Sequence, residues 1–343
     1  MLTEYGEPLE IKEVETPQPA DDEVLIETEA CGICRSDLHS WKGGMPLGRI
    51  PGHEPVGTIV EAGDAVEKFD EGDQVVLPYN VVCGRCDNCR AGNSHMCENA
   101  QFLGYTESLS GAYASHLRVP RADFNCTHIP DGFSATEMAG LGCRFVTAYH
   151  GLTTQTSLDP RKWVAVHGCG GVGLSAIAIA SAFGARVVAI DLFDEKLEMA
   201  EDFGATEVIN ATEVEDVPEA VTEIVPGGVD VSIDALGIED TVQNSMNSIG
   251  AMGTHLQIGE NFSEDGDLVE IPLNHLLYSQ ISYKNATGFP PHRYPEIFDL
   301  MEQGLVTPHE LVTNVVSLDE VSNRLEAMSN YETQGVEVIG EFE

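Results

Sequence analysis

The 343-residue sequence predicts an α/β protein in which a doubly wound parallel sheet follows a mostly β domain. The first observation is a glycine-rich turn between an apolar strand and an alanine-rich helix, within 163–191. The second is the alternation of short apolar strands and helical segments that continues downstream. The third is the N-terminal part, about 1–148, which is rich in β-branched residues and turn glycines and shows no long helical periodicity.

The glycine-rich turn is typical of a dinucleotide site. A strand at 163–166 enters the pattern G-x-G-x-x-G, and the helix that follows leads to a second strand, "RVVAI". Glycines allow a tight turn and a close approach of the backbone to a pyrophosphate at the helix N-terminus. The candidate contacts are Gly168, Gly170, Gly171, Val172 and Gly173.

Asp191 ends the second strand and predicts the choice of cofactor. Such a carboxylate hydrogen-bonds the adenosine ribose and repels a 2′-phosphate, and the following Leu192 and Phe193 offer no basic partner for a phosphate. NAD is therefore expected rather than NADP, although high salt would weaken the repulsion and leave some use of NADP open.

The alternation continues through the rest of this domain. We expect a helix over 194–203 ended by Gly204, strands at 207–210, 229–236 and 253–259, and helices near 215–224 and 239–249. Gly237 and Gly259, at strand ends, either border the cofactor or are simple turn glycines. His255 is expected on the surface. A further helix is expected at Tyr294–Glu302.

The charge is strongly acidic, with 57 Asp and Glu against 17 Lys and Arg and a formal net charge of −40. The acidic residues are spread over the whole chain, which argues against a disordered acidic tail. Such self-repulsion is tolerable where concentrated salt screens it, so we expect a protein from a halophile. The same charge argues against nucleic-acid binding. The sequence has no long apolar run and no signal-peptide pattern, which predicts a cytoplasmic protein without a membrane partner.

Four of the nine cysteines lie in "CGRCDNCRAGNSHMC". Four thiolates on a short loop rich in turn residues can enclose a tetrahedral Zn²⁺ and leave no position open for chemistry. A disulfide framework fits a reducing cytosol poorly, and an iron–sulfur cluster of the bacterial ferredoxin type would need a different spacing. The sequence therefore predicts a structural zinc site at Cys83, Cys86, Cys89 and Cys97.

Other metal-ligand residues are distributed along the chain, in "CGICRSDLH", "IPGHEPVG" and "GLGCRFVTAYHG". Each cysteine or histidine alone could be an ordinary core residue. Together they offer two thiolates and one imidazole, the set that binds a catalytic zinc with one open position.

These motifs, in this order and over nearly the whole chain, resemble the zinc-dependent medium-chain alcohol dehydrogenase family. The resemblance implies three ligands of a catalytic Zn²⁺: Cys34, His53 and Cys143. Cys31 is then the spare thiol of its CxxC pair, with a redox dithiol as the alternative. Glu54 follows the histidine ligand and can bind zinc when water is displaced, and Asp37 orients His53.

The resemblance also assigns residues near the reaction. It implies that Ser36 contacts the substrate oxygen and that His39 is the outer end of a proton relay. Arg35 and Thr147 occupy positions that contact the cofactor in this family. In isolation, Ser36 and His39 would be read as parts of a solvated loop.

The same resemblance implies a GroES-like catalytic domain at 1–148, a Rossmann NAD-binding domain at 149–286 and a C-terminal segment, 287–343, that returns to the catalytic domain. The expected reaction is the interconversion of an alcohol with its aldehyde or ketone, in a homotetramer of the microbial type. A polyol or sugar dehydrogenase on the same scaffold, a zinc-ribbon binding module and an inactive homologue are the alternatives. Trp41 and Phe102 either line the substrate pocket or belong to the core.

Overall fold

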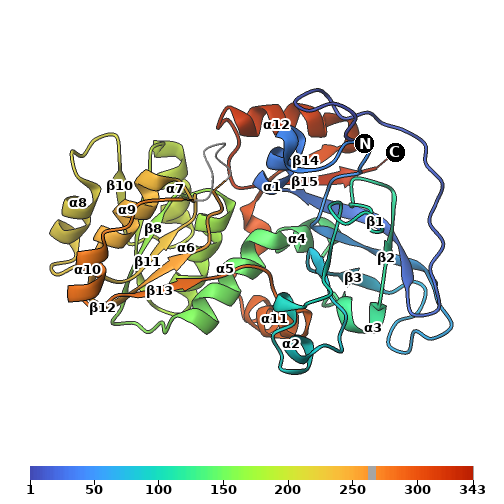
Figure 1. Cartoon of the computed structure of the whole chain (residues 1–343), viewed down its shortest axis with the longest axis horizontal. Helices are drawn as coiled ribbons and strands as arrows, with labels where there is room; N and C mark the ends of the chain where they lie inside the picture. Colours follow the sequence, from blue (N-terminus) through green and yellow to red (C-terminus); the bar gives the residue numbers. More distant parts are fainter. Residues whose placement is uncertain (262–267, 343) are drawn as a thin grey trace. The chain divides into compact units, whose positions relative to one another are not determined.

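The protein forms two compact units, shown here by a computed structural model that describes residues 1–261 and 268–342 (Figure 1). One unit contains Met1–Cys143 together with Gly288–Glu343, and the other contains Arg144–Thr287. The C-terminal segment thus belongs to the same unit as the N-terminal part. The border expected near 148 falls inside helix α5 (Gly142–Gln155), and the units divide between Cys143 and Arg144.

The second unit is built on six parallel strands in the order β10-β9-β8-β11-β12-β13. In chain order this is 3-2-1-4-5-6, the doubly wound arrangement, in which the order reverses between β8 and β11. The strands are β8 (Trp163–His167), β9 (Arg186–Asp191), β10 (Glu207–Asn210), β11 (Val229–Asp234), β12 (Ile249–Gln257) and β13 (Ser282–Asn285).

Helices connect these strands, as the alternating pattern predicts. They are α6 (Gly171–Ala182), α7 (Asp194–Asp202), α8 (Val217–Ile224), α9 (Glu239–Asn247) and α10 (Leu273–Tyr278). Helix α7 stops just before Gly204, whose φ of +101° is the left-handed conformation that glycine adopts without cost. The predicted helices and strands of this unit are confirmed, with boundaries shifted by a few residues.

The first unit is mostly β. Its seven-stranded sheet has the order β14-β15-β1-β2-β3-β7, and β6 pairs with β1. The strands are β1 (Val24–Ile33), β2 (Pro55–Ala62), β3 (Gln74–Val76), β6 (His116–Val119), β7 (Thr127–His128), β14 (Val312–Ser317) and β15 (Val336–Glu341). A short pair, β4 (Asn80–Val81) and β5 (Gln101–Phe102), forms a separate ribbon.

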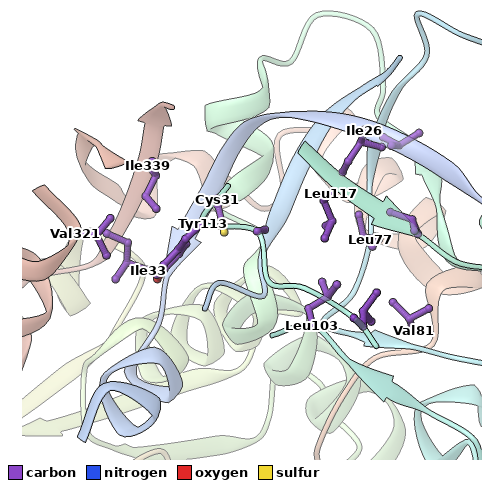
Figure 2. Packing of buried hydrophobic residues seen from close by; sticks show 14 of the residues in the cluster. Ile26, Cys31, Ile33, Leu77, Val81, Leu103, Tyr113, Leu117, Val321 and Ile339 are labelled. Atoms are coloured by element: carbon purple, nitrogen blue, oxygen red, sulfur yellow. The ribbon is translucent and has the colours of Figure 1, made fainter. Parts of the chain in front are cut away.

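The core of the first unit lies against this sheet (Figure 2). Ile26 and Ile33 of β1, Leu117 of β6 and Ile339 of β15 are fully buried, so strands from both ends of the chain share one core. This packing explains why the C-terminal segment belongs to the unit that the N-terminal segment begins, since both bury apolar area against β1.

Short helices complete the first unit: α1 (Arg35–His39), α2 (Asp87–Arg90), α3 (Ala122–Asn125), α4 (Ala135–Ala139), α11 (Tyr294–Glu302) and α12 (Val321–Ser329). Helix α11 has the bounds that the sequence predicts. The sequence-based interpretation missed the start of α5 at Gly142. Residues 144–152 of that helix are all buried, so it carries no amphipathic stripe that periodicity could detect. Within the described ranges, no helix is long and apolar enough to cross a membrane.

Candidate metal centre and dinucleotide site

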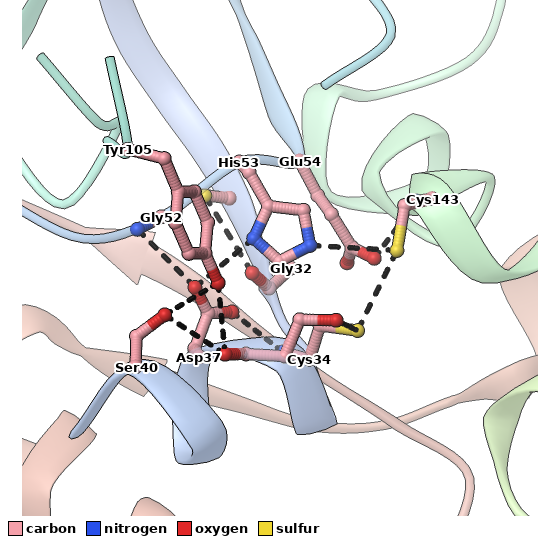
Figure 3. Close-up of polar contacts among 11 residues, drawn as sticks. Gly32, Cys34, Asp37, Ser40, Gly52, His53, Glu54, Tyr105 and Cys143 are labelled. Carbon is pink, nitrogen blue, oxygen red and sulfur yellow. Dashed lines mark hydrogen bonds and ion pairs between the residues drawn. The ribbon is translucent and has the colours of Figure 1, made fainter. Parts of the chain in front are cut away.

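Three segments bring sulfur and nitrogen atoms together in the first unit (Figure 3). Cys34 lies where β1 ends and α1 begins, His53 lies just before β2, and Cys143 is the second residue of α5. The Cys34 and Cys143 Sγ atoms are 3.5 Å apart, and His53 Nε2 is 3.4 Å from Cys143 Sγ. With a Glu54 carboxylate oxygen, the four candidate ligand atoms all lie within 4.8 Å of one another.

These separations fit a tetrahedral zinc site. Bonds of about 2.3 Å to sulfur and about 2.0 Å to nitrogen give tetrahedral edges of about 3.8 Å between sulfurs and about 3.5 Å between sulfur and nitrogen. The observed 3.5 and 3.4 Å edges lie close to these values, and the donors are the thiolate and imidazole ligands that Zn²⁺ favours. The residues present therefore fit the ion.

Asp37 links two of the candidate ligands. Its carboxylate is 1% exposed, lies 3.0 Å from His53 Nδ1 and accepts a hydrogen bond from the Cys34 backbone N–H at 2.9 Å. Burial alone would lower the pKa of His53, but the Asp37 carboxylate and the Cys34 sulfur together outweigh it and raise that pKa well above the ordinary value. The contact orients the ring so that Nε2 faces Cys143, which is the orientation expected of a metal ligand.

The Glu54 side chain points toward Cys143 (Figure 3). Its Oε1 accepts a hydrogen bond from the Cys143 backbone N–H at 2.8 Å, which anchors the start of α5. A Cβ built on Gly142 would come within 2.6 Å of the Glu54 carboxylate, so only glycine allows this close approach. Gly142 is a site residue that the sequence-based interpretation did not single out, although it lies within the quoted "GLGCRF".

Ser36 stands beside the same cluster. Its Oγ is 3.7 Å from Cys34 Sγ. Its carbonyl oxygen lies 3.0 Å from Tyr105 Oη and 2.9 Å from Ser40 Oγ, and the two hydroxyl oxygens also lie within hydrogen-bond distance of each other. Burial raises the pKa of Tyr105 to about 12, so this phenol stays a proton donor. Tyr105 and Ser40 hold the short helix α1 in place, a role that no sequence motif indicated.

Three further residues were expected near the reaction or the cofactor: His39, Arg35 and Thr147. His39 ends α1, and a Cβ on Gly44 would meet its ring at 2.2 Å, so the ring packs on this glycine. The Arg35 guanidinium is exposed and lies over the Tyr331 ring, 5.1 Å from its centroid. Thr147 is buried in α5, in the second unit.

Cys31 is a core residue. It is fully buried within β1, and burial raises its pKa far above the ordinary value of a thiol. None of the nine cysteines, all of which lie in the described ranges, forms a disulfide. A thiol that stays protonated is a poor nucleophile, which disfavours a redox dithiol with Cys34.

The four clustered cysteines form a second candidate metal site in the first unit. The Sγ–Sγ distances are 4.0 Å for Cys83–Cys89, 3.5 Å for Cys86–Cys89 and 3.9 Å for Cys86–Cys97. A zinc–sulfur tetrahedron has edges of about 3.8 Å, so the geometry fits. Hydrogen bonds from the backbone at Arg85 lower the pKa of Cys83 to about 6, whereas burial raises that of Cys89 to about 12.

The segment that leads into this cluster is held by side chains that sequence reasoning missed. Asn125 is fully buried, and its amide accepts from the Val82 N–H at 2.8 Å and donates to the Val82 carbonyl at 3.1 Å. Arg121 Nε donates to the same carbonyl at 2.7 Å. These contacts set the position of Cys83, but a lone asparagine forty residues away gives no recognisable pattern.

The glycine-rich turn of the second unit joins β8 to α6. Gly168 has φ +95°, and a Cβ on Gly173 would lie 1.8 Å from the Gly168 carbonyl oxygen, so the turn and the helix contact both require glycine. A Cβ on Gly171 would press on the Arg144 side chain, whereas one on Gly170 would meet nothing within 4 Å. The backbone is therefore open at Gly170, the N-cap of α6, where a pyrophosphate can approach. Val172, in the first turn of α6, is half-buried.

Asp191 lies at the end of β9, where the pattern predicts it. Its Oδ2 accepts from the Cys169 backbone N–H at 2.7 Å, and its Oδ1 accepts from the Leu192 N–H at 2.8 Å. These bonds hold the carboxylate at the mouth of the glycine turn. Oδ1 also accepts from the Phe193 N–H at 3.2 Å, so Oδ2 is the oxygen that keeps a lone pair for a ribose hydroxyl, because a carboxylate oxygen can accept two hydrogen bonds.

Gly237 and Gly259 follow β11 and β12, and the two turns interlock. A Cβ on Gly237 would lie 2.5 Å from the Glu260 carbonyl carbon, and one on Gly259 would lie 2.3 Å from the Leu236 nitrogen. Packing of the two turns against each other therefore accounts for both glycines. The expectation that His255 is a surface residue is wrong. It is completely buried in β12, because Ser245 and Gln257 satisfy both ring nitrogens within the interior.

The two aromatic residues proposed for a substrate pocket differ in position. Trp41 belongs to the core of the first unit, and its Nε1 donates to the Glu7 carbonyl at 2.6 Å. Phe102 is 40% exposed and stacks on Tyr79, with ring centroids 5.8 Å apart. Tyr79 in turn lines a small cavity together with His53, Cys143 and Tyr294.

Comparison with known proteins identifies the family. The alcohol dehydrogenase GroES-like domain matches residues 20–131, and the zinc-binding dehydrogenase domain matches residues 171–303. An alcohol dehydrogenase of Geobacillus stearothermophilus is 34% identical over 95% of this chain and 94% of the relative. The chain belongs to the zinc-dependent alcohol dehydrogenase family. It is therefore an oxidoreductase with a GroES-like catalytic unit and a Rossmann unit.

Further relatives agree with this assignment. An NAD-dependent alcohol dehydrogenase of Sulfurisphaera tokodaii is 32% identical, over 98% of both chains. A sorbitol dehydrogenase of Bacillus subtilis is 32% identical over 96% of this chain and 93% of the relative. Among solved structures, the alcohol dehydrogenase of the archaeon Aeropyrum pernix superposes with a TM-score of 0.88 and 30% identity, over 98% of both chains.

Proposed function

We propose that Cys34, His53 and Cys143 hold a catalytic Zn²⁺ at which an alcohol is oxidised to its aldehyde or ketone. The observation that carries this proposal is the convergence of their three donor atoms at tetrahedral spacings, with Asp37 on the far nitrogen of the imidazole. Three protein ligands leave one position open for substrate. Glu54, within reach of the same point, can occupy that position when no substrate is there.

Zn²⁺ bound there supplies a Lewis acid that lowers the pKa of an alcohol hydroxyl. Ser36, beside Cys34, is placed to accept the hydroxyl proton, and His39, at the other end of α1, would be the outer end of a proton relay through the cofactor ribose. Asp37 holds the imidazole and the Cys34 backbone so that neither ligand has to reorganise during the reaction. Bound NAD would supply the acceptor for the hydride from the carbon that bears this hydroxyl.

The four-cysteine cluster holds a structural Zn²⁺ in this proposal. All four donors are protein thiols at spacings close to tetrahedral, so no position is open to a substrate. The ion stabilises the loop from Cys83 to Cys97, whose only helices are one-turn segments too short to be stable alone.

NAD is the cofactor of the second unit in this proposal. Gly168, Gly170, Gly171, Val172 and Gly173 present the turn and the N-terminus of α6 to the pyrophosphate, and Asp191 bonds the adenosine ribose. Arg35 and Thr147 are further proposed cofactor contacts. Gly237 and Gly259 support the proposal only indirectly, because their packing role already explains them. Preference for NAD follows from Asp191 and should appear as a higher kcat/KM with NAD than with NADP.

The substrate class is a simple primary or secondary alcohol. Tyr79, Met138 and Tyr294 line a small, mainly apolar cavity together with Cys143. A polyol is the second candidate, favoured by the similarity to the Bacillus subtilis sorbitol dehydrogenase. A polyol is more polar than a simple alcohol, so the two candidates need substrate pockets of different polarity. Activity with a panel of ethanol, butanol, cyclohexanol, glucose and sorbitol therefore separates them.

The enzyme is proposed to be a cytoplasmic homotetramer without nucleic-acid or membrane partners. Strand β13 ends the parallel sheet and is exposed along its whole length, and α10 presents Leu273, Leu277 and Tyr278 at 63–81% exposure. An open strand edge beside exposed apolar side chains is a surface that a second copy can cover. Light scattering in molar salt tests the assembly.

Adaptation to high salt is part of the proposal. Among the described residues, the buried carboxylates are few, and each has a partner: Glu23, Asp37, Glu54, Asp234 and Glu337. The remaining described acidic side chains reach the surface, where only dissolved ions can screen their repulsion. Stability should fall steeply when salt is diluted from molar concentration to about 0.05 M. Equal stability at both concentrations would contradict the proposal.

One assay tests the central activity. NADH absorbance is followed with the alcohol panel in molar salt, and zinc content is measured on the same preparation. We expect alcohol-dependent NADH formation and two zinc ions per chain, one from each cluster. The absence of turnover with every alcohol, in a folded protein that holds both ions, would support the inactive homologue instead.

A further inference from the structure

A chain of buried polar side chains runs through the second unit, beneath the carboxyl ends of β11 and β12. Its members come from β11, α9 and β12: Ser232, Asp234, Ser245, His255 and Gln257. All but Gln257 have no exposed surface. Polar groups at this depth are costly unless they are fully hydrogen-bonded, so their arrangement is specific.

The members are linked one to the next. Ser232 Oγ lies 2.9 Å from Ser245 Oγ, and Ser245 Oγ lies 3.0 Å from His255 Nδ1. His255 Nε2 lies 3.0 Å from Gln257 Oε1. Gln257 Nε2 donates to the Asp234 carboxylate and, at 2.8 Å, to the Gly259 carbonyl oxygen.

The proton positions along this chain follow from its ends. A carboxylate can only accept, so the Gln257 amide presents its NH₂ to Asp234 and its oxygen to His255. His255 then carries its proton on Nε2, and Nδ1 accepts from the Ser245 hydroxyl. Burial lowers the pKa of His255, which keeps the imidazole neutral as this pattern requires.

Asp234 connects this chain of hydrogen bonds to the two turns that follow β11 and β12. Its Oδ2 accepts from the Gly237 N–H at 2.7 Å, and its backbone oxygen accepts from the Gly259 N–H at 2.8 Å. The turns also interlock at these two glycines, so neither can move alone. They border a cavity of about 300 Å³, which Gln257 and Tyr283 also line.

We propose that His255 and Gln257 are positioning residues for the dinucleotide site. They fix Asp234, and Asp234 fixes the turns at Gly237 and Gly259, which lie where parallel α/β sheets bind their ligands. The inference rests on the proposed NAD site of this unit. Cofactor affinity then depends on the turns that these two side chains hold: His255 is completely buried, and Gln257 also lines the cavity.

Leucine substitutions at either position test this link. In Gln257→Leu, the Asp234 carboxylate and the Gly259 carbonyl lose a donor, and in His255→Leu the Gln257 oxygen loses one. We expect the Kd of NADH, measured by fluorescence titration in molar salt, to rise about tenfold in each variant. KM for NAD should rise similarly, with kcat at saturating NAD changing less. The double variant should be no weaker than the weaker single one, because both break one chain.

Two matched variants separate positioning from general packing. His255→Gln keeps an N–H donor near the place of Nε2 and should restore most of the affinity. Ser248→Ala removes another completely buried hydroxyl at the end of α9, which donates only to the Asn244 carbonyl at 2.7 Å. It should leave the Kd unchanged. An equal loss of affinity in Ser248→Ala would overturn the inference, as would leucine variants that bind NADH within about twofold of the parent.

Amide hydrogen exchange in the protein without cofactor provides a measurement that does not depend on NADH. Peptides covering 235–237 and 257–259 should exchange faster in both leucine variants and at the parental rate in Ser248→Ala. Unchanged exchange in the leucine variants would also overturn the inference. A parent protein that fails to bind NADH contradicts the proposed function itself, whereas a binding parent with unaffected variants contradicts only this inference.

Discussion

The two cysteine clusters of the first unit differ in how the chain builds them. One lies within a single loop from Cys83 to Cys97, and the other is drawn from three segments between Cys34 and Cys143. A loop can bring close neighbours together with turn residues alone. Residues more than a hundred positions apart meet only after β1, β2 and α5 have assembled.

The surroundings differ as well. The loop cluster, within Cys83 to Cys97, has four thiols and receives hydrogen bonds mainly from backbone N–H groups. The distributed cluster, between Cys34 and Cys143, combines its two thiols with an imidazole, two carboxylates and a hydroxyl. Four thiolates fill all the coordination positions of a zinc ion. Mixed donors with an outer carboxylate leave one position open and adjust the reactivity of the ion. In the function proposed here, the first cluster stabilises the fold and the second carries the reaction, and substitutions can test this difference.

The largest effect is expected from Cys34→Ala. Loss of one of three ligands at an open site should remove the ion and lower kcat by about a thousandfold or more. Zinc analysis should show one ion per chain instead of two, and far-UV circular dichroism should stay unchanged because Cys34 lies just after β1, outside the strands of the sheet. Activity close to that of the parent would remove the basis for the distributed site.

Cys89→Ala should produce the opposite pattern. The loop cluster contributes its metal-binding free energy to folding, so the thermal midpoint should fall by roughly 10 °C. The folded fraction should keep kcat within about threefold, because Cys89 has no contact with the distributed cluster. A variant that is stable but inactive would reverse the roles assigned to the two clusters.

Asp37→Asn should give an intermediate effect. The amide keeps the shape but loses the charge that orients the His53 imidazole and the Cys34 backbone. Outer partners of this kind contribute about 10- to 100-fold to metal affinity or activity, and we expect a loss of that size in competition with a chelator. Zinc at the loop cluster serves as the internal control and should be retained.

Glu54→Gln should have the smallest effect. The Gln side chain keeps an oxygen that can accept from the Cys143 N–H, so the start of α5 is preserved. If Glu54 occupies the open position only between turnovers, kcat should change by about threefold or less. A loss as large as that of Cys34→Ala would make Glu54 a permanent ligand rather than a transient one.

Patterns confined to neighbouring residues were predictable. The strand, glycine turn and helix from Trp163 onward, the carboxylate at Asp191 and the helix Tyr294–Glu302 all lie where the pattern predicts them. The spacing of the four clustered cysteines likewise specifies a compact group of thiols. In each case the determining contacts lie within a few turns of backbone, so residue type and spacing contain the information.

The position of His255 could not be predicted from local sequence patterns. This histidine was expected at the surface, yet it is completely buried. Its partners Ser245 and Gln257 are ordinary in the sequence and meet it only because α9 packs on the sheet. The start of α5 was missed for a related reason, since burial on all sides removes the periodicity that identifies a helix.

The sequence by itself determined the fold class, the two groups of candidate metal-ligand residues and the carboxylate proposed to select the cofactor. Only the tertiary structure decided which atoms meet: Cys143 with Cys34 and His53, Glu54 with the start of α5, and Asp234 with two interlocked turns. The reason is physical. Local pattern fixes backbone conformation over a few residues, whereas contacts between distant segments depend on how buried faces pack.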